Sequence, residues 1–466
     1  MSVPSHPIAS LDLMISTMPT RFPALNPTLQ LIVAALLLVL MMTACVTAHA
    51  QDRRMVSEPS LPPQSAVCIT LLPVPASSSA QDTRRLQQAI DACGAGQAVR
   101  LMAGIAGGRF VSGPLVMKSG VTLWLDEGVT LVAAADPALF DRNGRCGTID
   151  EKGAGCRPFL LFEGTRGGGI VGTGRIDGQG GEIMAGSTQS WWQLARRAQQ
   201  EHGKQNVPRL IQVVHAHDIT FYRITLTNAP NFHLSLSQTE GATLWGIRID
   251  TPADARNTDG IDPADSQDVT IAHSFIRTGD DHIAIKAGHG GTRYVSIVDD
   301  HLYWGHGLSI GSEIAGGVSD ILVRDVSIDG AVSGLRIKSD ASRGGLVSAV
   351  RYENVCLRNN RHPLEFDTRY DAHAKGDAIP VYRDILLRHV SGEGGSLVVR
   401  GHDADHPLAL MLDGVAFAGG AIWQVDYAHL GAGPGGVSPL PAGLTAPPAG
   451  VEQMQCAARW VPFPSG

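Results

Sequence analysis

The sequence predicts an all-β protein with a single domain, folded as a right-handed parallel β-helix with an N-terminal capping helix. Short β-rich segments recur with a period in the twenties, helical periodicity is scarce, and glycine occupies 54 of the 466 residues. A period of this kind is typical of a solenoid, in which each coil buries its apolar face only against its neighbours. Charged residues make up only 17% of the chain, which is consistent with a large core.

Seven segments rich in β-branched residues carry the repeat. From Asp218 to Ala242 is 24 residues, and the last interval, from Ala349 to Asp384, is 35. Helices are too scarce for a leucine-rich, ankyrin or tetratricopeptide array, so stacked coils of short parallel strands fit best. The segments begin at Asp218, Ala242, Asp268, Tyr294, Asp320, Ala349 and Asp384.

Two stretches show helical spacing of apolar residues. Residues 82–93 (DTRRLQQAIDAC) form the clearer one, and we expect them to cap the N-terminal end of the solenoid. A helical turn is possible at residues 191–200. The Gly/Pro-rich stretch 430–450 is expected to be a loop.

The N-terminus predicts a signal peptide, residues 1–50, ahead of a β-helix domain at residues 51–466. An uncharged apolar run at residues 31–42 follows Arg21 and precedes Ala48-His49-Ala50, which resembles a cleavage site. The run is shorter than the roughly 20 residues that span a membrane. We therefore expect a secreted, extracellular protein without membrane association after cleavage. A periplasmic location, or a lipid anchor through Cys45 in a loose lipobox, is the alternative.

The charge balance limits the classes of partner. The 37 Lys and Arg residues and 44 Asp and Glu residues give a net charge of −7, which argues against general affinity for nucleic acid or anionic membranes. We expect a monomer.

Six cysteines remain after removal of the leader, and an even count in an exported chain favours disulfides. Many connectivities are possible, but sequence order makes Cys68–Cys93 and Cys146–Cys156 the short-range candidates and leaves Cys356 for Cys456. The spacing of the cysteines is unlike that of zinc sites, so no metal is expected.

Polar clusters lie about one coil apart in the middle of the repeat. From Asp259 to Asp280 is 21 residues, and from Asp281 to His306 is 25. Positions one period apart lie about 4.8 Å from each other in a parallel stack, so these clusters are expected to line one face. Each residue alone could be a turn residue or part of an exposed strand. Stacked like charges cost stability, so together they indicate a functional cleft. The cluster residues are Asp259, Asp280, Asp281, His306, Arg336 and Lys338.

Four motifs around these residues resemble those of the polygalacturonases, glycoside hydrolase family 28. They are NTDGID at 257–262, TGDDHIAIKAG at 278–288, GHGLSIGSE at 305–313 and RIKSD at 336–340. The resemblance extends over residues 65–465, including PRLIQ at 208–212 and NAPNFHLSLS at 228–237. His282 departs from the Cys or Asn that many members carry, which affects a local packing detail.

The resemblance implies hydrolysis of the α-1,4 links between galacturonates in polygalacturonate, with inversion and without a cofactor. Asp280 matches the family's general acid, and Asp259 and Asp281 match the pair that holds and deprotonates the water. We expect the like charges of Asp259 and Asp281 to raise the pKa of Asp280. Gly279 permits the bend that lets Asp280 and Asp281 face one cleft. Strand spacing alone, about 5 Å, would favour retention, because inverting enzymes usually separate their carboxylates by about 6.5–9.5 Å; we follow the family.

The remaining site residues are assigned by the same resemblance. His306 is expected to tune the protonation of the acid. Arg336 and Lys338 are expected to hold a substrate carboxylate, the arginine through a planar fork and the lysine as a point charge. Tyr370 could stack on or hydrogen-bond a sugar, or be an ordinary surface tyrosine.

We expect endo action. The motif-bearing coils are joined by short connections, and SDASRGG at 339–345 looks like endo-acting members. The alternatives are an exo-polygalacturonase, a rhamnogalacturonan hydrolase, a calcium-dependent pectate lyase and a carbohydrate-binding β-helix adhesin without enzymatic activity.

Overall fold

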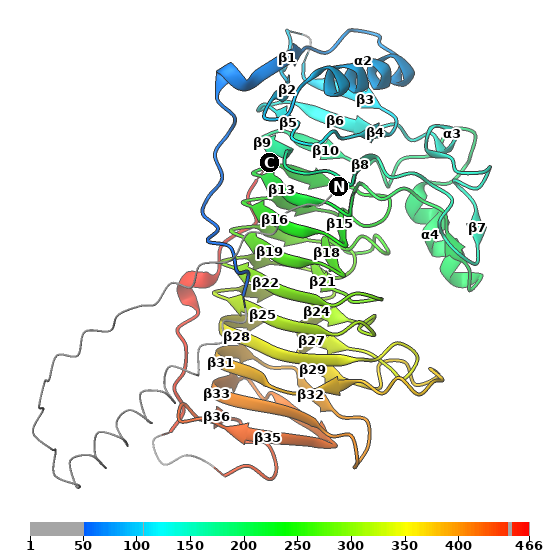
Figure 1. Cartoon of the computed structure of the whole chain (residues 1–466). Helices are drawn as coiled ribbons and strands as arrows, with labels where there is room; N and C mark the ends of the chain where they lie inside the picture. Colours follow the sequence, from blue (N-terminus) through cyan, green and yellow to red (C-terminus); the bar gives the residue numbers. More distant parts are fainter. Residues whose placement is uncertain (1–50, 106, 446–449, 466) are drawn as a thin grey trace, which may run out of the picture. The chain divides into compact units, whose positions relative to one another are not determined.

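Parallel strands stacked coil upon coil form the body of the protein (Figure 1). The computed structural model describes residues 51–105, 107–445 and 450–465. The predicted signal peptide, with Cys45, lies outside these residues. In the part of the chain that is described, no helix is both long and apolar enough to cross a membrane.

One parallel sheet carries the predicted polar clusters, and we call it the site sheet. It runs along the stack from β4, near the N-terminal end, to β34, near the C-terminal end. Its strands are β4 (Leu115–Val116), β8 (Leu160–Glu163), β12 (Ile211–Val214), β15 (Leu234–Ser237), β18 (Ile261–Ala264), β21 (Ile283–Ile285), β24 (Leu308–Gly311), β27 (Ser333–Lys338), β29 (His362–Asp367), β32 (Ser396–Arg400) and β34 (Ile422–Asp426).

The other strands of the coils form a second, larger sheet, and they also pair in parallel with the coils before and after them. These strands are β1 (Val67–Leu71), β2 (Ala98–Leu101), β3 (Arg109–Ser112), β5 (Thr122–Leu125), β6 (Thr130–Ala133), β9 (Gly169–Gly172), β10 (Arg175–Asp177), β13 (His217–Tyr222), β14 (Thr225–Thr227), β16 (Glu240–Trp245), β17 (Arg248–Asp250), β19 (Gln267–Ala272), β20 (Phe275–Arg277), β22 (Thr292–Val298), β23 (His301–Leu302), β25 (Val318–Arg324), β26 (Ser327–Asp329), β28 (Leu346–Arg358), β30 (Val381–Tyr382), β31 (Ile385–Glu393), β33 (Leu408–Ala418), β35 (Ala428–Ala432) and β36 (Val437–Ser438).

The predicted repeat corresponds to β13, β16, β19, β22, β25, β28 and β31 of this second sheet. Val269 pairs with Val295, and in the next coils Ile321 pairs with Val350. The residue just before these positions has a left-handed backbone, a conformation that Asp tolerates better than most residues. This explains why aspartate recurs at the segment starts. The left-handed residues are Asp218, Asp268, Tyr294, Asp320, Ala349 and Asp384, with φ between 51° and 58°.

Alternation along the site sheet separates the core from the cleft. Ile283 pairs with Leu308, and Leu308 pairs with Leu335; all three are fully buried. Burial of an aliphatic side chain of this size contributes about 1.5–3 kcal/mol. The next residue in each strand points to the opposite face, which places Ser309 and Arg336 on the outer surface of the sheet.

Helix α2 (Ser79–Ala92) packs against β3 and β4 at the N-terminal end of the stack, as Figure 1 shows. It begins three residues before the predicted start because Ser78 and Gln81 form a capping box. Leu86 and Ile90 form its buried face.

The stretch at residues 191–200 is a full helix, α4 (Trp191–Gln200), stabilised by a second capping box. Near it lie the helical turn α3 (Pro137–Phe140) and the antiparallel pair β7 (Ile149–Asp150) and β11 (Lys204–Gln205). The two 3-10 helices of the described chain are η1 (Gln64–Ala66) and η2 (Ala457–Arg459).

The prediction of a loop at residues 430–450 is wrong for part of the stretch. Residues 430–432 complete β35, and β36 lies within the stretch; both strands pair with β33. The last coil leaves unpaired backbone groups at the sheet edge, and these groups order a segment whose Gly and Pro content conceals a strand. Val437 is accordingly buried.

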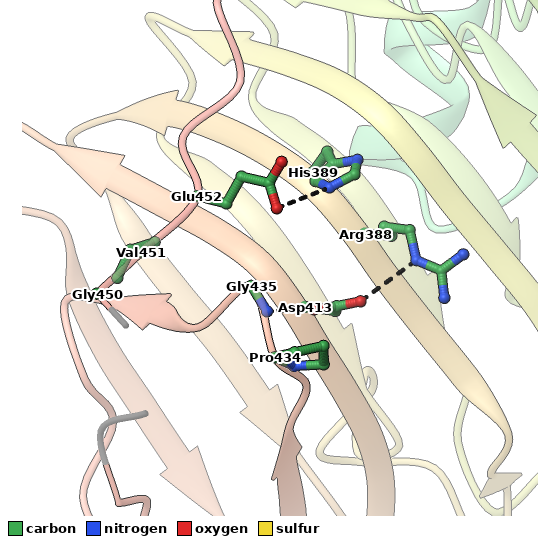
Figure 2. Close-up of a pocket in the computed structure, with 8 residues that line it drawn as sticks. All are labelled: Arg388, His389, Asp413, Pro434, Gly435, Gly450, Val451 and Glu452. Carbon is green, nitrogen blue, oxygen red and sulfur yellow. Dashed lines mark hydrogen bonds and ion pairs between the residues drawn. The ribbon is translucent and has the colours of Figure 1, made fainter. Parts of the chain in front are cut away.

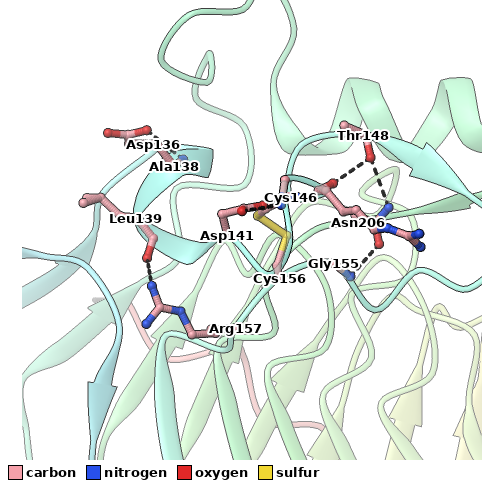
Figure 3. Close-up of a disulfide and its surroundings, with 12 residues drawn as sticks. Asp136, Ala138, Leu139, Asp141, Cys146, Thr148, Gly155, Cys156, Arg157 and Asn206 are labelled. Atoms are coloured by element: carbon pink, nitrogen blue, oxygen red, sulfur yellow. Dashed lines mark hydrogen bonds between the residues drawn. A yellow bond between two sulfur atoms is a disulfide. The ribbon is translucent and has the colours of Figure 1, made fainter.

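The three predicted disulfides are present and join Cys68 to Cys93, Cys146 to Cys156 and Cys356 to Cys456. Figure 3 shows the second of these disulfides in the lobe that contains α3 and β7. Asn206 ties the same lobe together, since its side chain accepts from Gly155 N–H at 2.6 Å and donates to Thr148 Oγ1 at 3.2 Å.

Removing the Cys356–Cys456 disulfide, by replacing both residues with alanine, is expected to lower the free energy of unfolding by about 2–5 kcal/mol. The bond closes a segment of 100 residues, and the entropy that a cross-link removes from the unfolded chain grows with the length of the closed segment. Cys146 and Cys156 are 10 residues apart, so their double alanine variant is the matched control and should lose less. Denaturant unfolding measures both, and a larger loss in the control would contradict the prediction.

Candidate active site

The ends of four neighbouring strands of the site sheet surround a cleft of about 460 Å³. The strands are β18, β21, β24 and β27, which pair in that order. All seven residues predicted to bind or act on a substrate contribute to the lining. The lining residues are Phe232, Arg256, Asn257, Asp259, Asp280, Asp281, Lys286, His306, Gly311, Ser312, Glu313, Val332, Arg336, Lys338 and Tyr370.

The strand register brings together residues that are far apart in sequence. Ile261 pairs with Ile283, and Ile283 pairs with Leu308. Asp259 and Asp281 each lie two residues before their paired isoleucine, and His306 lies two residues before Leu308. The expected one-coil spacing of the polar clusters therefore corresponds to contacts between adjacent strands.

Gly279 allows both members of the acidic pair to reach the cleft. The chain bends at residues 279–280, as the sequence predicts. A Cβ atom at position 279 would lie 2.0 Å from the carbonyl oxygen of Ala255, so close backbone approach requires the glycine. Its N–H donates to Thr258 Oγ1 at 3.0 Å, which fastens the bend to the preceding coil.

Asp281 is a buried carboxylate held by two cations. Lys338 Nζ lies 2.7 Å from its Oδ2, Arg336 Nη1 lies 3.6 Å from its Oδ1, and Ser309 Oγ donates to Oδ1 at 2.9 Å. Burial opposes ionisation of Asp281, but Lys338 and Arg336 outweigh it and hold the pKa below its usual range. Asp281 is therefore a permanent anion in the neutral pH range.

Asp280 faces His306 and the open side of the cleft. His306 Nδ1 lies 3.0 Å from Asp280 Oδ1, and the same oxygen accepts the N–H of Asp281 at 2.9 Å. The hydrogen bond with Asp280 raises the pKa of His306. The side chain of Asp280 is 18% exposed, against 5% for Asp259 and 3% for Asp281, so Asp280 is the most open of these three carboxyl groups.

Asp259 shares a lysine with a second carboxylate that the sequence reasoning left without a role. Lys286 Nζ lies 3.2 Å from Asp259 Oδ2 and 2.7 Å from Asp262 Oδ2. Burial raises the pKa of Asp259 well above its ordinary value, with Asp262 adding to the rise and Lys286 opposing it. The signal that identifies Lys286 is strand alternation, because Ala284 and Lys286 occupy the outward positions after Ile283, as Arg336 and Lys338 do after Leu335.

Arg336 and Lys338 lie side by side on the outer face of β27, as predicted. Arg336 also pairs with Glu365 at 2.9 Å. Tyr370 covers both cations, with its ring centre 5.2 Å from the Arg336 guanidinium carbon and 5.4 Å from Lys338 Nζ. Tyr370 thus lies at the cleft rather than on a remote surface loop.

His282 packs beneath the turn that carries His306. It is fully buried and its Nε2–H donates to the carbonyl oxygen of Trp304 at 3.0 Å. Burial lowers the pKa of His282 to about 4. Gly305 has φ 151°, and a Cβ there would lie 2.5 Å from His282 Nε2. Histidine at position 282, where the resemblance predicts Cys or Asn, therefore affects the packing beneath this turn.

Oxygen and nitrogen atoms of Asp280, Asp281 and His306 lie within 4.8 Å of one another, close enough to hold one metal ion. Lys338 and Arg336 already neutralise Asp281. Two fixed cations beside the cluster repel a further positive charge, so we assign no metal to it.

A second hollow, of about 390 Å³, lies in the last coils (Figure 2). Its charges face each other: Arg388 pairs with Asp413 at 3.3 Å and His389 with Glu452 at 3.6 Å. Pro434, Gly435, Gly450 and Val451 complete the lining. Matched charges beside Gly, Pro and Val residues offer less chemistry than the first cleft.

The lobe with the Cys146–Cys156 disulfide reaches the cleft. Gln205, in β11, donates from Nε2 to Asn257 Oδ1 at 2.9 Å, and Asn257 lines the cleft. This lobe therefore borders the end of the cleft nearest the N-terminal coils.

A model of the glycosyl hydrolases family 28 matches residues 93–432. The chain belongs to this family. Membership makes the protein a glycoside hydrolase with the parallel β-helix fold, and the cleft on the site sheet its candidate active site.

Three bacterial proteins are similar to this chain over most of its length. The chain is 42% identical over 388 residues to an endo-polygalacturonase of Pectobacterium parmentieri, covering 82% of this chain and 94% of that protein. It is 42% identical over 437 residues to a polygalacturonase of Ralstonia nicotianae, covering 81% and 82%. The solved structure of a polygalacturonase from Erwinia carotovora ssp. carotovora has 41% identity and a TM-score of 0.78, over 82% of this chain and all of that one.

Proposed function

We propose that residues 51–466 form a single secreted domain that hydrolyses α-1,4-galacturonosyl links inside polygalacturonate chains, with inversion. The observation that carries the proposal is that Arg336 and Lys338 pair with the buried carboxylate of Asp281 in a cleft that Asp259 and Asp280 also line. Glycoside hydrolysis needs a pair of carboxyl groups, and two adjacent cations suit a sugar that bears a carboxylate.

Asp280 is the proposed general acid. It gives its proton to the glycosidic oxygen as the bond from that oxygen to the anomeric carbon breaks. Its greater exposure supports this role, because the acid must reach the leaving oxygen. His306 contacts Asp280 and is proposed to tune its protonation.

Asp281 and Asp259 are proposed to hold and deprotonate the water. The oxygen of that water bonds to the anomeric carbon on the face opposite the leaving group, and its proton passes to this pair. The low pKa of Asp281 supports a carboxylate that stays ionised at the pH where Asp280 must be protonated.

Arg336, Lys338 and Tyr370 are proposed to bind a galacturonate. Both cations pair with Asp281. A substrate carboxylate would therefore share them with Asp281, one of the two residues proposed to hold the water. Tyr370, which lies over both cations, is positioned to stack on the sugar ring.

Endo action is supported by the relatives named endo-polygalacturonase, which share 42% identity over most of the chain. Secretion is supported by the three disulfides, which persist in oxidising compartments, and by the predicted leader. The same relatives support polygalacturonate as the polymer bound. We expect the mature protein to act as a monomer.

Digestion of polygalacturonate by the mature protein in EDTA, followed by mass spectrometry of products over time, tests the proposal. We expect saturated oligomers of mixed length from the first minutes. Monomer alone would mean exo action, and unsaturated products or a requirement for calcium would mean a lyase. Binding without turnover would mean an adhesin, and faster turnover of rhamnogalacturonan would change the assigned substrate. The anomer released first, observed by proton NMR, should be β if the reaction inverts.

A further inference from the structure

Two buried charged side chains have no part in the steps above: Asp262 in β18, and Lys286, which follows β21 and lines the cleft. Lys286 Nζ lies between Asp262 Oδ2, at 2.7 Å, and Asp259 Oδ2, at 3.2 Å. The two carboxylates are almost completely buried and Lys286 is mostly buried. One ammonium group is therefore shared by two carboxylates.

Asp259, Asp262 and Lys286 together have two negative charges and one positive charge when all three are ionised. Burying an unpaired carboxylate is costly, and Oδ1 of Asp259 and Oδ1 of Asp262 have no hydrogen-bond partner among the described residues. Lys286 lies 4.5 Å from the centre of the Phe232 ring, so an apolar surface limits its access to water. The structure thus couples the charge of Asp259 to that of Asp262 through one lysine.

The other charged groups that face this trio come from four further places in the fold. Arg209 attracts the carboxylates of Asp259 and Asp262, whereas Asp280 and Asp281 repel that of Asp259. Glu313 attracts the ammonium group of Lys286. His233 Nδ1 lies 3.0 Å from the backbone oxygen of Asp259. We expect these surroundings to be the same in variants at Asp262 and at Lys286.

We propose that Asp262 and Lys286 are positioning residues that set the charge of Asp259: Lys286 stabilises its carboxylate and Asp262 competes for the same ammonium group. The inference rests on the proposed function, in which Asp259 helps to take the proton from water. Asp259 must be ionised to do so, and the competition between its two neighbours decides at which pH it ionises.

The two neighbours act in opposite directions. Removal of the Lys286 charge leaves Asp259 without its counterion and favours the protonated form, so activity should be lost at a higher pH than in the wild type. Removal of the Asp262 charge gives Lys286 entirely to Asp259 and favours the ionised form. Activity should then persist to a lower pH.

The test compares the pH dependence of kcat/KM on polygalacturonate for Lys286→Met and Asp262→Asn, because this parameter reports groups of the free enzyme. The acidic limb should move up in the first variant and down in the second, each by about 1–3 pH units. Lys286→Arg keeps the charge and should stay within a few tenths of a unit of wild type. A loss of packing alone would lower the whole profile without moving its limbs.

Asp300 supplies the matched control, since it is a buried aspartate beyond β22 that accepts from Ser274 N–H and does not line the cleft. Asp300→Asn should leave the limb unmoved. Thermal unfolding establishes that each variant is folded, and if Lys286→Met is not, Asp262→Asn still decides the direction. Limbs that stay in place, or move together, would overturn the inference. Failure of the proposed function would show instead in the wild type, as an absence of saturated galacturonate products.

Discussion

Replacing Asp280 with asparagine is expected to lower kcat on polygalacturonate by about 10²–10⁴-fold, the usual contribution of a general acid. Asparagine keeps an oxygen that can accept the N–H of Asp281, which Asp280 accepts at 2.9 Å, but it has no proton to give to the leaving oxygen. Initial rates of reducing-end release at saturating polymer measure the loss.

Binding should survive this substitution. Arg336 and Lys338 are paired with Asp281 rather than with Asp280, so the affinity of Asp280→Asn for galacturonate oligomers, measured by calorimetry, should stay within a few-fold of wild type. Full turnover by the variant would remove Asp280 from the proposed mechanism. A wild-type protein that binds the oligomers but does not hydrolyse them would instead be an adhesin.

Replacing Arg336 or Lys338 with alanine is expected to lower kcat/KM by about 30-fold or more. Truncating one partner of a buried charge pair costs about 2–5 kcal/mol, and here the partner includes the substrate carboxylate. Asp281 would also lose a counterion, so kcat should fall together with affinity. Steady-state kinetics on polygalacturonate measure both.

Arg400→Ala is the matched control for these cations. Arg400 belongs to β32 of the same sheet and pairs with Asp367 at 2.8 Å, but it does not line the cleft. It should change kcat/KM by less than a few-fold. A methyl-esterified polymer offers a second check, because without substrate carboxylates the loss in Arg336→Ala should shrink. Unchanged kinetics in both cleft variants would remove the assignment of an acidic substrate.

The repeat and the position of the cleft could be predicted from the sequence because a solenoid converts spacing along the chain into distance. Residues about one period apart, such as Asp281 and His306, lie on neighbouring strands. The same regularity made Arg336 and Lys338 predictable as a pair, since alternate residues of a strand share a face. The order of the cysteines likewise predicted the observed pairings, because the first two disulfides join cysteines that are close in sequence, 25 and 10 residues apart.

Segments without a period were predicted less well. Residues 191–200 form a full helix because Ser190 and Gln193 cap it, and residues 437–438 form a strand because the end of the stack offers backbone partners. The reason for Gly279 is also tertiary: the carbonyl of Ala255, from the preceding coil, leaves no room for a Cβ atom.

By itself the sequence determined the coil repeat and the face that carries the charged residues, and it predicted seven residues that the structure places in the lining of one cleft. Only the tertiary structure decided how the charges are shared: that Lys338 and Arg336 hold Asp281 in its anionic form, and that Lys286 serves both Asp259 and Asp262. The physical reason is that periodicity specifies which residues are neighbours, whereas the ionisation of a carboxyl group depends on burial and on differences in contact distance of less than 1 Å.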